Sequence, residues 1–289
     1  MRPRLYSTAT PWLKCATSKL TLRVSLEIAT NIMTPATHES TTRFSNRVAD
    51  YVRYRPGYPE ELVQTLRDEA GVTPASVVAD IGSGTGISTE LFLRLGCVVL
   101  AVEPNREMRE AAEAQFRDQP GFRSIDGTAE ATSLEAASVG LVVAGQAFHW
   151  FDVARTRTEF ARILRPAGIV ALFWNSRHLD TTPFLRGYET LLQDFATDYQ
   201  QVDHKRIDAA VLKQFFGGDH FQTRTFPNSQ SFDFEGLRGR LLSSSYAPSA
   251  GDPRHTPMLL ELECLFQENA RGGRVSFDYD TELYFGRLA

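Results

Sequence analysis

The chain has 289 residues, of which 42% are hydrophobic, and a formal net charge of −4. This length can bury one sizeable core, or a core with an attached cap, and the mildly acidic balance argues against a dedicated nucleic-acid-binding protein. Three widely spaced cysteines, Cys15, Cys97 and Cys264, form no C-x-x-C pair. Neither a zinc site nor a disulfide framework is therefore indicated, and no run of about 18 apolar residues predicts a membrane span.

The first 40 residues are expected to form a leader outside the folded part. Residues 1–26 contain basic residues, many Ser and Thr, and no acid. That composition has two interpretations, an organellar transit peptide or an upstream extension with the true start at Met33. A reducing cytoplasm is the default location, and organellar import follows only from the transit-peptide interpretation.

Residues 41–74 predict an N-terminal strap followed by a helix. Aromatic and basic side chains alternate over residues 42–58, and Pro56-Gly57 breaks this run. Pro59 then precedes a predicted helix over residues 60–69, which has acids in its first turn.

A glycine-rich turn follows the first predicted strand. Residues 77–81 are apolar and mostly β-branched, as in a buried parallel strand. Gly82, Gly84 and Gly86 allow positive φ and close approach of a ligand to the backbone. The helix expected over residues 88–95 directs its free N–H groups at that ligand. A nucleotide-like molecule is therefore expected at this turn.

Strands and helices then alternate through residues 75–175, which predicts an α/β fold with a doubly wound parallel sheet and helices on both faces. The second strand ends at Glu103, and an acid about 20 residues beyond the glycines suits ribose hydroxyls. Asp152 is a predicted helix cap. The expected strands are 97–102, 122–125, 139–144 and 169–174, and the expected helices are 106–116 and 153–164.

The C-terminal part departs from this alternation. Residues 176–219 are expected to form a helical cap insertion, and residues 220–289 to supply strands and helices that complete the sheet. A strand is predicted over 221–232, interrupted at Pro227-Asn228. The remaining expected elements are helices over 183–195, 205–216, 234–242 and 257–269, and a strand over 275–285.

The order and spacing of these elements resemble the core of class I S-adenosylmethionine (SAM) methyltransferases. The turn reads Gly-x-Gly-x-Gly with Asp80 two residues earlier, and residues 163–168 read Ile-Leu-Arg-Pro-Ala-Gly, which is typical of the small-molecule branch. Arg-Pro-Gly-Tyr-Pro at 55–59 and Gln-Ala-Phe-His-Trp-Phe at 146–151 are similar to trans-aconitate-type methyltransferases. The resemblance implies a seven-stranded, mostly parallel Rossmann-like sheet and SAM as cofactor.

Cofactor contacts are expected at the glycine turn, after the second and third strands and after the fourth strand. Small residues and N–H groups suit the methionine tail, and Glu103 suits the ribose. Asp80 either contacts the cofactor or only braces the turn. By resemblance, Ala129 and Glu130 hold the adenine, with Pro104 nearby; Glu130 could instead be only an acid at a helix start. The expected set is Asp80, Gly82, Ser83, Gly84, Gly86, Glu103, Pro104, Ala129, Glu130 and Gln146.

His149 is the candidate catalytic residue. It could act as a general base on a hydroxyl, orient a carboxylate acceptor, or only hydrogen-bond the backbone at a helix start. Expected acceptor contacts, each of which could instead be ordinary packing, are Tyr51, Tyr54, Arg55, Tyr58, Trp150 and Tyr246.

Gly-Gln-Ala-Phe stands at residues 145–148, where enzymes that methylate nucleic-acid bases carry Asp/Asn-Pro-Pro-Tyr/Phe. The favoured function is therefore methyl transfer to a small organic acceptor, at a carboxylate or a hydroxyl. Two alternatives remain. One is a SAM-binding protein without transferase activity. The other is a nicotinamide oxidoreductase, which the glycine spacing disfavours because that fingerprint is G-x-G-x-x-G.

Overall fold

The structure, a computed structural model, describes residues 52–197, 199 and 207–288. All of them belong to one compact unit, His38–Ala289. The expected leader and the acceptor candidate Tyr51 lie outside the described residues. Within these residues, no helix is both long and apolar enough to cross a membrane.

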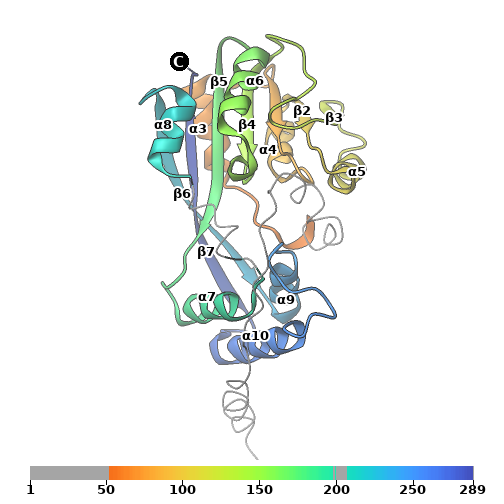
Figure 1. Ribbon diagram of the computed structural model, residues 1–289, viewed down its shortest axis with the longest axis vertical. Coiled ribbons are helices and arrows are strands. Elements are labelled where there is room, and N and C mark those ends of the chain that lie inside the picture. Colours follow the sequence, from red (N-terminus) through yellow and green to blue (C-terminus); the bar gives the residue numbers. More distant parts are fainter. Residues whose placement is uncertain (1–51, 198, 200–206, 289) are drawn as a thin grey trace, which may run out of the picture. The chain divides into compact units, whose positions relative to one another are not determined.

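The described residues form a central sheet of seven strands in the order β3-β2-β1-β4-β5-β7-β6 (Figure 1). The pairs from β3 to β5 are all parallel, whereas β7 runs antiparallel to both β5 and β6. The predicted mostly parallel doubly wound sheet is therefore confirmed. The strands are β1 Val77–Ile81, β2 Val98–Val102, β3 Phe122–Ile125, β4 Val139–Gly145, β5 Leu164–Arg177, β6 Phe221–Phe232 and β7 Val275–Gly286.

Helices cover both faces of the sheet because the central strands are apolar on both sides. Val78 packs in one buried cluster with Leu62 of α3 and Phe92 of α4. Its neighbour Ala79 points to the other face and packs with Phe160 of α6, since successive strand side chains alternate. The helices are α3 Glu60–Ala70, α4 Ile87–Leu95, α5 Arg106–Gln115, η1 Phe148–Trp150, α6 Val153–Ile163, α7 Pro183–Phe195, α8 Ala209–Phe216, α9 Phe234–Leu242 and α10 His255–Asn269.

Strands β6 and β5 depart most from their predictions, β6 in its continuity and β5 in its length. The expected interruption of β6 at Pro227-Asn228 is wrong, because β6 pairs with β7 without a break and Pro227 lies opposite Asp280. Proline lacks an N–H group, but β6 is an edge strand, so the missing donor would face away from β7. Strand β5 also runs further than residues 169–174. It passes Phe173, which pairs with the last residue of β4, and continues to Arg177, which pairs with β7.

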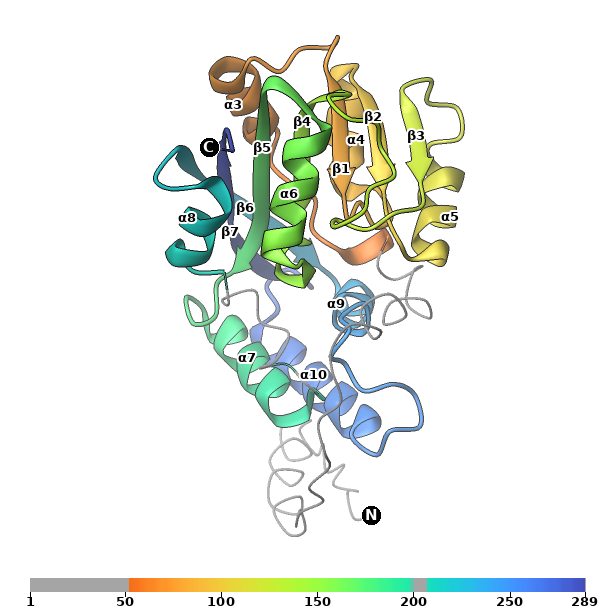
Figure 2. The same ribbon diagram turned by 45° about the horizontal axis from the view of Figure 1, so that its top comes forward.

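A third buried cluster lies beyond the carboxyl end of β5, where α7, α9 and α10 gather (Figure 2). It is built around Phe277 of β7, with Tyr188 of α7, Leu237 of α9 and Leu262 of α10. The expected cap segment 176–219 contributes to two places. Its helix α7 packs on α10 in this cluster, and its helix α8 packs on α6 against the sheet.

Candidate functional site

The glycine turn after β1 has the left-handed backbone that its sequence predicts. Gly82, Gly84 and Gly86 have φ values of 67°, 56° and 93°. A Cβ atom on Gly82 would lie 2.7 Å from the Cβ of Ala147, and one on Gly86 would collide with the ring of Phe116. The turn is thus held between the loop after β4 and the end of α5. Any larger residue at either position would displace it.

Asp80 is fully buried beneath this turn. Its Oδ2 accepts hydrogen bonds from Ser88 Oγ at 2.7 Å and Thr89 Oγ1 at 2.6 Å. Burial raises the pKa of this carboxyl to about 6, although the two hydroxyl donors oppose the shift. In the described part of the chain, Asp80 Oδ1 and the hydroxyl of buried Thr85 have no hydrogen-bond partner. Asp80 therefore braces the turn and also leaves an acceptor atom beside it.

Glu103 closes the other side of the turn. Strand β2 lies beside β1 in register, Ile81 opposite Val102, so the residue after β2 lies next to the glycines. Its Oε2 accepts from Gly84 N at 3.0 Å, and its Oε1 accepts from Asn105 N at 2.8 Å. Burial raises the pKa of this carboxyl, and the two N–H donors limit the rise. A carboxylate offers about four acceptor positions, so two remain for a pair of hydroxyl groups.

Ala129 and Glu130 lie in the loop after β3. Ala129 is buried inside the narrow turn that the Thr128–Ala131 bridge closes. Glu130 Oε1 accepts from the backbone N–H of Asp152 at 2.9 Å, and the Asp152 side chain caps α6 as predicted. Glu130 thus ties its loop to the start of α6. The carbonyl of the neighbouring candidate Pro104 accepts from Arg109 Nη1 at 2.9 Å.

The loop after β4 has a strained backbone. Gln146 has φ 56°, a left-handed value that residues other than glycine rarely adopt and that recurs at functional sites. Its N–H donates to Phe173 O at 2.8 Å, and its side-chain oxygen accepts from Asn175 N at 2.9 Å. These two bonds hold the chain reversal against β5. They bring the 3-10 turn that contains His149 and Trp150 to the carboxyl end of the sheet.

His149 is partly buried and Trp150 is 38% exposed, with 4.8 Å between their ring centroids. The preceding Phe148 packs edge-on against Phe215 in the core. The turn is therefore anchored by Phe148, while the next two side chains lie at its outer side.

The strap places Tyr58 beside this loop. The Tyr58 ring packs edge-on against Phe173 at 4.7 Å, and its hydroxyl oxygen would be 2.9 Å from a Cβ atom on Gly145. The Gly57 carbonyl accepts from Asn175 Nδ2 at 3.1 Å and from Asn228 Nδ2 at 2.9 Å. The structure therefore brings the entry segment of the chain to the carboxyl ends of β4 and β5.

The remaining acceptor candidates contact α9, its end or the third cluster. The Tyr54 ring packs on the backbone of Gly239, Arg55 Nη2 donates to Ser243 O at 3.1 Å, and Tyr246 lies at the edge of the third cluster. Tyr54 and Arg55 thus meet α9 and its end, whereas Tyr58 meets the sheet.

Three residues of the candidate site, Thr85, Asn175 and Asn228, are not among the contacts expected from the sequence. Asn175 directly follows the predicted fifth strand, and a polar residue at the carboxyl end of a parallel strand is a signal that could have found it. Thr85 stands between two of the glycines.

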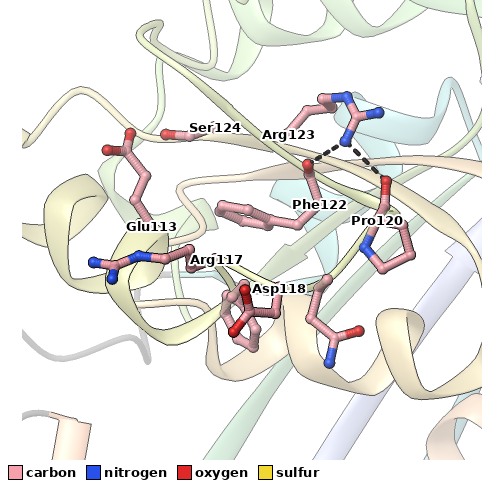
Figure 3. A pocket seen from close by; sticks show the side chains of 9 residues that line it. Glu113, Arg117, Asp118, Pro120, Phe122, Arg123 and Ser124 are labelled. Atoms are coloured by element: carbon pink, nitrogen blue, oxygen red, sulfur yellow. Dashed lines mark hydrogen bonds between the residues drawn. The ribbon is translucent and has the colours of Figure 1, made fainter.

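An open pocket between the end of α5 and the start of β3 is lined by none of the residues predicted from the sequence to contact cofactor or acceptor, although Phe116, which packs against Gly86, belongs to its lining (Figure 3). One of its two arginines, Arg123, donates to the carbonyl oxygens of Phe122 at 2.6 Å and Pro120 at 2.9 Å. Its guanidinium is therefore bonded to the local backbone.

Comparison with known proteins places this arrangement in a family. A family model described as a methyltransferase domain matches residues 79–172. An uncharacterised methyltransferase of Schizosaccharomyces pombe is 30% identical over 202 residues, which cover 70% of this chain and 77% of that protein. An uncharacterised methyltransferase of Mycobacterium tuberculosis is 39% identical over 145 residues. That match covers 50% of this chain and 57% of the relative, so it spans little more than half of the relative's length.

Solved structures share the fold. A candidate type II methyltransferase from Anaeromyxobacter dehalogenans has a TM-score of 0.62 at 21% identity, over 81% of this chain and 98% of that one. A SAM-dependent methyltransferase from Geobacter sulfurreducens, solved with S-adenosylhomocysteine, has a TM-score of 0.51 at 16% identity, over 85% and 98%. The similarity to trans-aconitate-type enzymes stays a prediction. The chain belongs to the methyltransferase family, and its fold is that of the class I SAM-dependent methyltransferases.

Proposed function

We propose that this protein transfers a methyl group from SAM to a small organic acceptor, at a carboxylate or a hydroxyl. The observation that carries the proposal is the pair of buried polar atoms at the glycine turn, Asp80 Oδ1 and Thr85 Oγ1, which lack partners among the described residues. Buried polar atoms are normally satisfied, so these two fit the polar tail of a ligand.

The residues around the turn suit each part of SAM. The left-handed glycines and Ser83 present no bulky side chain to the methionine portion. Their own N–H groups are bonded within the protein, to Val102 O, Glu103 Oε2 and Ser83 O, so the unpartnered polar atoms at the turn are those of Asp80 and Thr85. The free acceptor positions of Glu103 fit the two ribose hydroxyls. Ala129 and Glu130 line the loop proposed for the adenine. Gln146 holds the loop that would separate cofactor from acceptor.

SAM supplies a methyl group already activated by a sulfonium, which an acceptor displaces in line. The protein therefore needs to orient the acceptor and exclude water rather than supply a strong nucleophile. His149 is proposed to remove a proton from a hydroxyl acceptor, or to orient a carboxylate acceptor, which needs no base. Tyr58 and Trp150 are proposed to flank the acceptor.

The alternative, a SAM-binding protein without transferase activity, predicts the same cofactor contacts, because a fold does not fix the chemistry that it supports. The nicotinamide alternative requires a pyrophosphate site, and the turn has the shorter Gly-x-Gly-x-Gly spacing.

The test is calorimetric titration of the full chain with SAM, S-adenosylhomocysteine and NAD. Glu103→Ala should bind S-adenosylhomocysteine about 30-fold more weakly, because two hydrogen bonds to the ribose at about 1 kcal/mol each are lost. Glu103→Gln keeps one acceptor oxygen and should lose about one such bond, or about fivefold in affinity. Glu107→Ala, an exposed acid on α5, is the control and should bind as the wild type does. Circular dichroism checks that each variant is folded.

NAD binding alone, or no binding, would refute the cofactor assignment. A screen of small acids and alcohols as acceptors then distinguishes a methyltransferase from a SAM-binding protein without transferase activity. The enzyme releases S-adenosylhomocysteine with an acceptor. His149→Gln should lower kcat for a hydroxyl acceptor and leave the S-adenosylhomocysteine affinity unchanged.

A further inference from the structure

Buried and half-buried arginines and tyrosines gather at the carboxyl end of β5 and on the helices that follow it. We call Arg177, Arg240, Tyr188, Tyr199 and Tyr246 the arginine–tyrosine cluster. They come from the end of β5, from α7 and α9, and from the segments that follow those helices. Aromatic packing holds them together, with 5.0 Å between the rings of Tyr199 and Tyr246.

One of the two arginines is neutralised within the protein. Arg177 Nη2 lies 2.6 Å from Glu189 Oε2 and 3.1 Å from the hydroxyl of Tyr199, which also donates to Glu189 at 2.8 Å. The guanidinium also faces the ring of Tyr188, 5.2 Å from its centroid. Arg177 and Glu189 thus form a paired, hydrogen-bonded unit.

Arg240 has no such partner. Its residue is 6% exposed, and its side-chain partners are hydroxyl groups: that of Ser244, whose Oγ lies 3.3 Å from Nη1, and that of Tyr279. Its Nε has no partner, and among residues 52–197, 199 and 207–288 it forms no ion pair. Burying an uncompensated charge is strongly unfavourable. A negatively charged ligand would therefore stabilise Arg240, because no carboxylate among the described residues neutralises it.

A second unsatisfied group lies beside it. Tyr188 is 1% exposed, and its hydroxyl has no hydrogen-bond partner within the described part of the chain. Both side chains contact the same ring, that of Phe277. The Tyr188 ring packs edge-on to it at 4.8 Å, and the Arg240 guanidinium carbon is 5.9 Å from its centroid.

The surrounding electrostatics agree with a charged Arg240. Burial opposes its positive charge, but the neighbouring tyrosines outweigh that effect and the pKa of Arg240 lies above its ordinary value. Burial alone would raise the pKa of Tyr246, yet the charges of Arg240, Arg55 and Arg177 hold it below its usual range. Both directions reflect the same mutual attraction between Arg240 and the neighbouring phenols.

We propose that Arg240 and Tyr188 bind a carboxylate group of the methyl acceptor. A guanidinium and a phenol together supply donors matched to one carboxylate, whose single negative charge would balance the positive charge of Arg240. The acceptor class is thus a small organic acid that carries this carboxylate and, separately, the group that is methylated. This inference rests on the proposed methyl transfer.

The strap gives an estimate of the length of such an acceptor. Its residue Tyr58 touches the loop after β4, and Arg55 bonds to Ser243 O, whose own hydroxyl donates to the Arg240 carbonyl at 2.7 Å. Three residues of chain span at most about 10 Å. Residues 55–58 therefore link the neighbourhood of Arg240 to the loop after β4 over at most about 10 Å of chain, and the proposal takes an acid of a few carbon atoms as the acceptor.

The experiment measures thermal unfolding of the full chain in sodium acetate and in sodium chloride at equal ionic strength. Acetate is the smallest convenient carboxylate and fits any site built for a larger one. Wild-type Tm should rise in acetate by about 2–4 °C once acetate is several-fold above its Kd. Tyr188→Phe should show a smaller rise. Arg240→Met should show none.

Arg238→Met is the matched control, because Arg238 lies on the same helix with its side chain 46% exposed. It should keep the full acetate response. In chloride, Arg240→Met should melt no lower than the wild type, because it removes an uncompensated buried charge. A structural arginine would instead cause a clear loss of Tm.

Three results would overturn the proposal. They are an equal acetate response in wild type and Arg240→Met, no acetate response in the wild type, and an equal response to sulfate or phosphate, which would make the site a general anion site. Binding of S-adenosylhomocysteine to Arg240→Met separates this inference from the methyltransferase proposal. That binding should be unchanged, and its absence from the wild type would instead refute the proposed function.

Discussion

Replacement of Asp80 by asparagine tests how the buried carboxyl beneath the glycine turn is used. The ordinary pKa of 3.8 is raised to about 6 by burial, so the folded state holds a proton that the unfolded state releases. Stability from this group is fully present below about pH 4 and is lost as the pH rises through about 6. At neutral pH, the ionised, buried Asp80 lowers the free energy of unfolding by about 3 kcal/mol.

The pH dependence gives the magnitude to be measured. At pH 5 the unfolded carboxyl is ionised while the folded one is mostly protonated, so roughly half of the loss has already occurred. Between pH 5 and pH 7.5, wild-type stability should fall by a further amount of about 1.4 kcal/mol relative to Asp80→Asn. The asparagine carries no charge, and its carbonyl can still accept from Ser88 or Thr89, so the comparison isolates the titration.

The assay is urea unfolding of both proteins across this pH range, followed by tryptophan fluorescence. Ligand affinity supplies a second measurement. If the ionised Asp80 accepts a hydrogen bond from the ammonium of S-adenosylhomocysteine, wild-type affinity should be about tenfold weaker at pH 5 than at pH 7. Asp80→Asn should bind weakly at both. A stability difference that does not change with pH, together with pH-independent binding, would refute the reasoning.

Two further substitutions test the packing around the site. Gly86→Ala should lower the free energy of unfolding by about 2–4 kcal/mol, because it combines a left-handed backbone with a collision against Phe116; Gly57→Ala has open space and should cost nothing in the same chemical denaturation. Asn175→Ala should cost about 1–3 kcal/mol, because it leaves the buried Thr281 hydroxyl, now 2.6 Å from Asn175 Oδ1, without that acceptor. An unchanged midpoint for Asn175→Ala would mean that the strap is held without it.

The local geometry of the proposed cofactor side could be predicted from sequence because its signals are local. The glycine turn, Glu103 and the Asp152 cap each depend on residues a few positions apart, or on neighbouring strands whose register follows from the fold. The position of Pro227 required more, because an edge strand is recognised only once the strand order is known.

The acceptor side could not be read in this way. Asn175 meets Gly57 across 118 positions of sequence, and Arg240 meets Tyr188 only because α7 and α9 pack on the same strand residue, Phe277. The isolation of Arg240 from any described carboxylate is equally invisible in sequence, since Glu235 lies only five positions before it. Such features depend on tertiary packing and not on any local pattern.

The extension of β5 past Phe173, the residue that pairs with the end of β4, has a consequence for the rigidity of the fold. Strands β5, β7 and β6 run unbroken from the cofactor sheet to the helices α7, α9 and α10. A hinge between these two regions would have to break consecutive hydrogen bonds in both the β5–β7 and the β6–β7 pairings. We therefore expect this part of the sheet to be rigid. At the proposed acceptor site, we therefore expect movement of the strap and of side chains rather than a change in the spacing of these two regions. The spacing between the glycine turn and the arginine–tyrosine cluster would then limit the length of the acceptor.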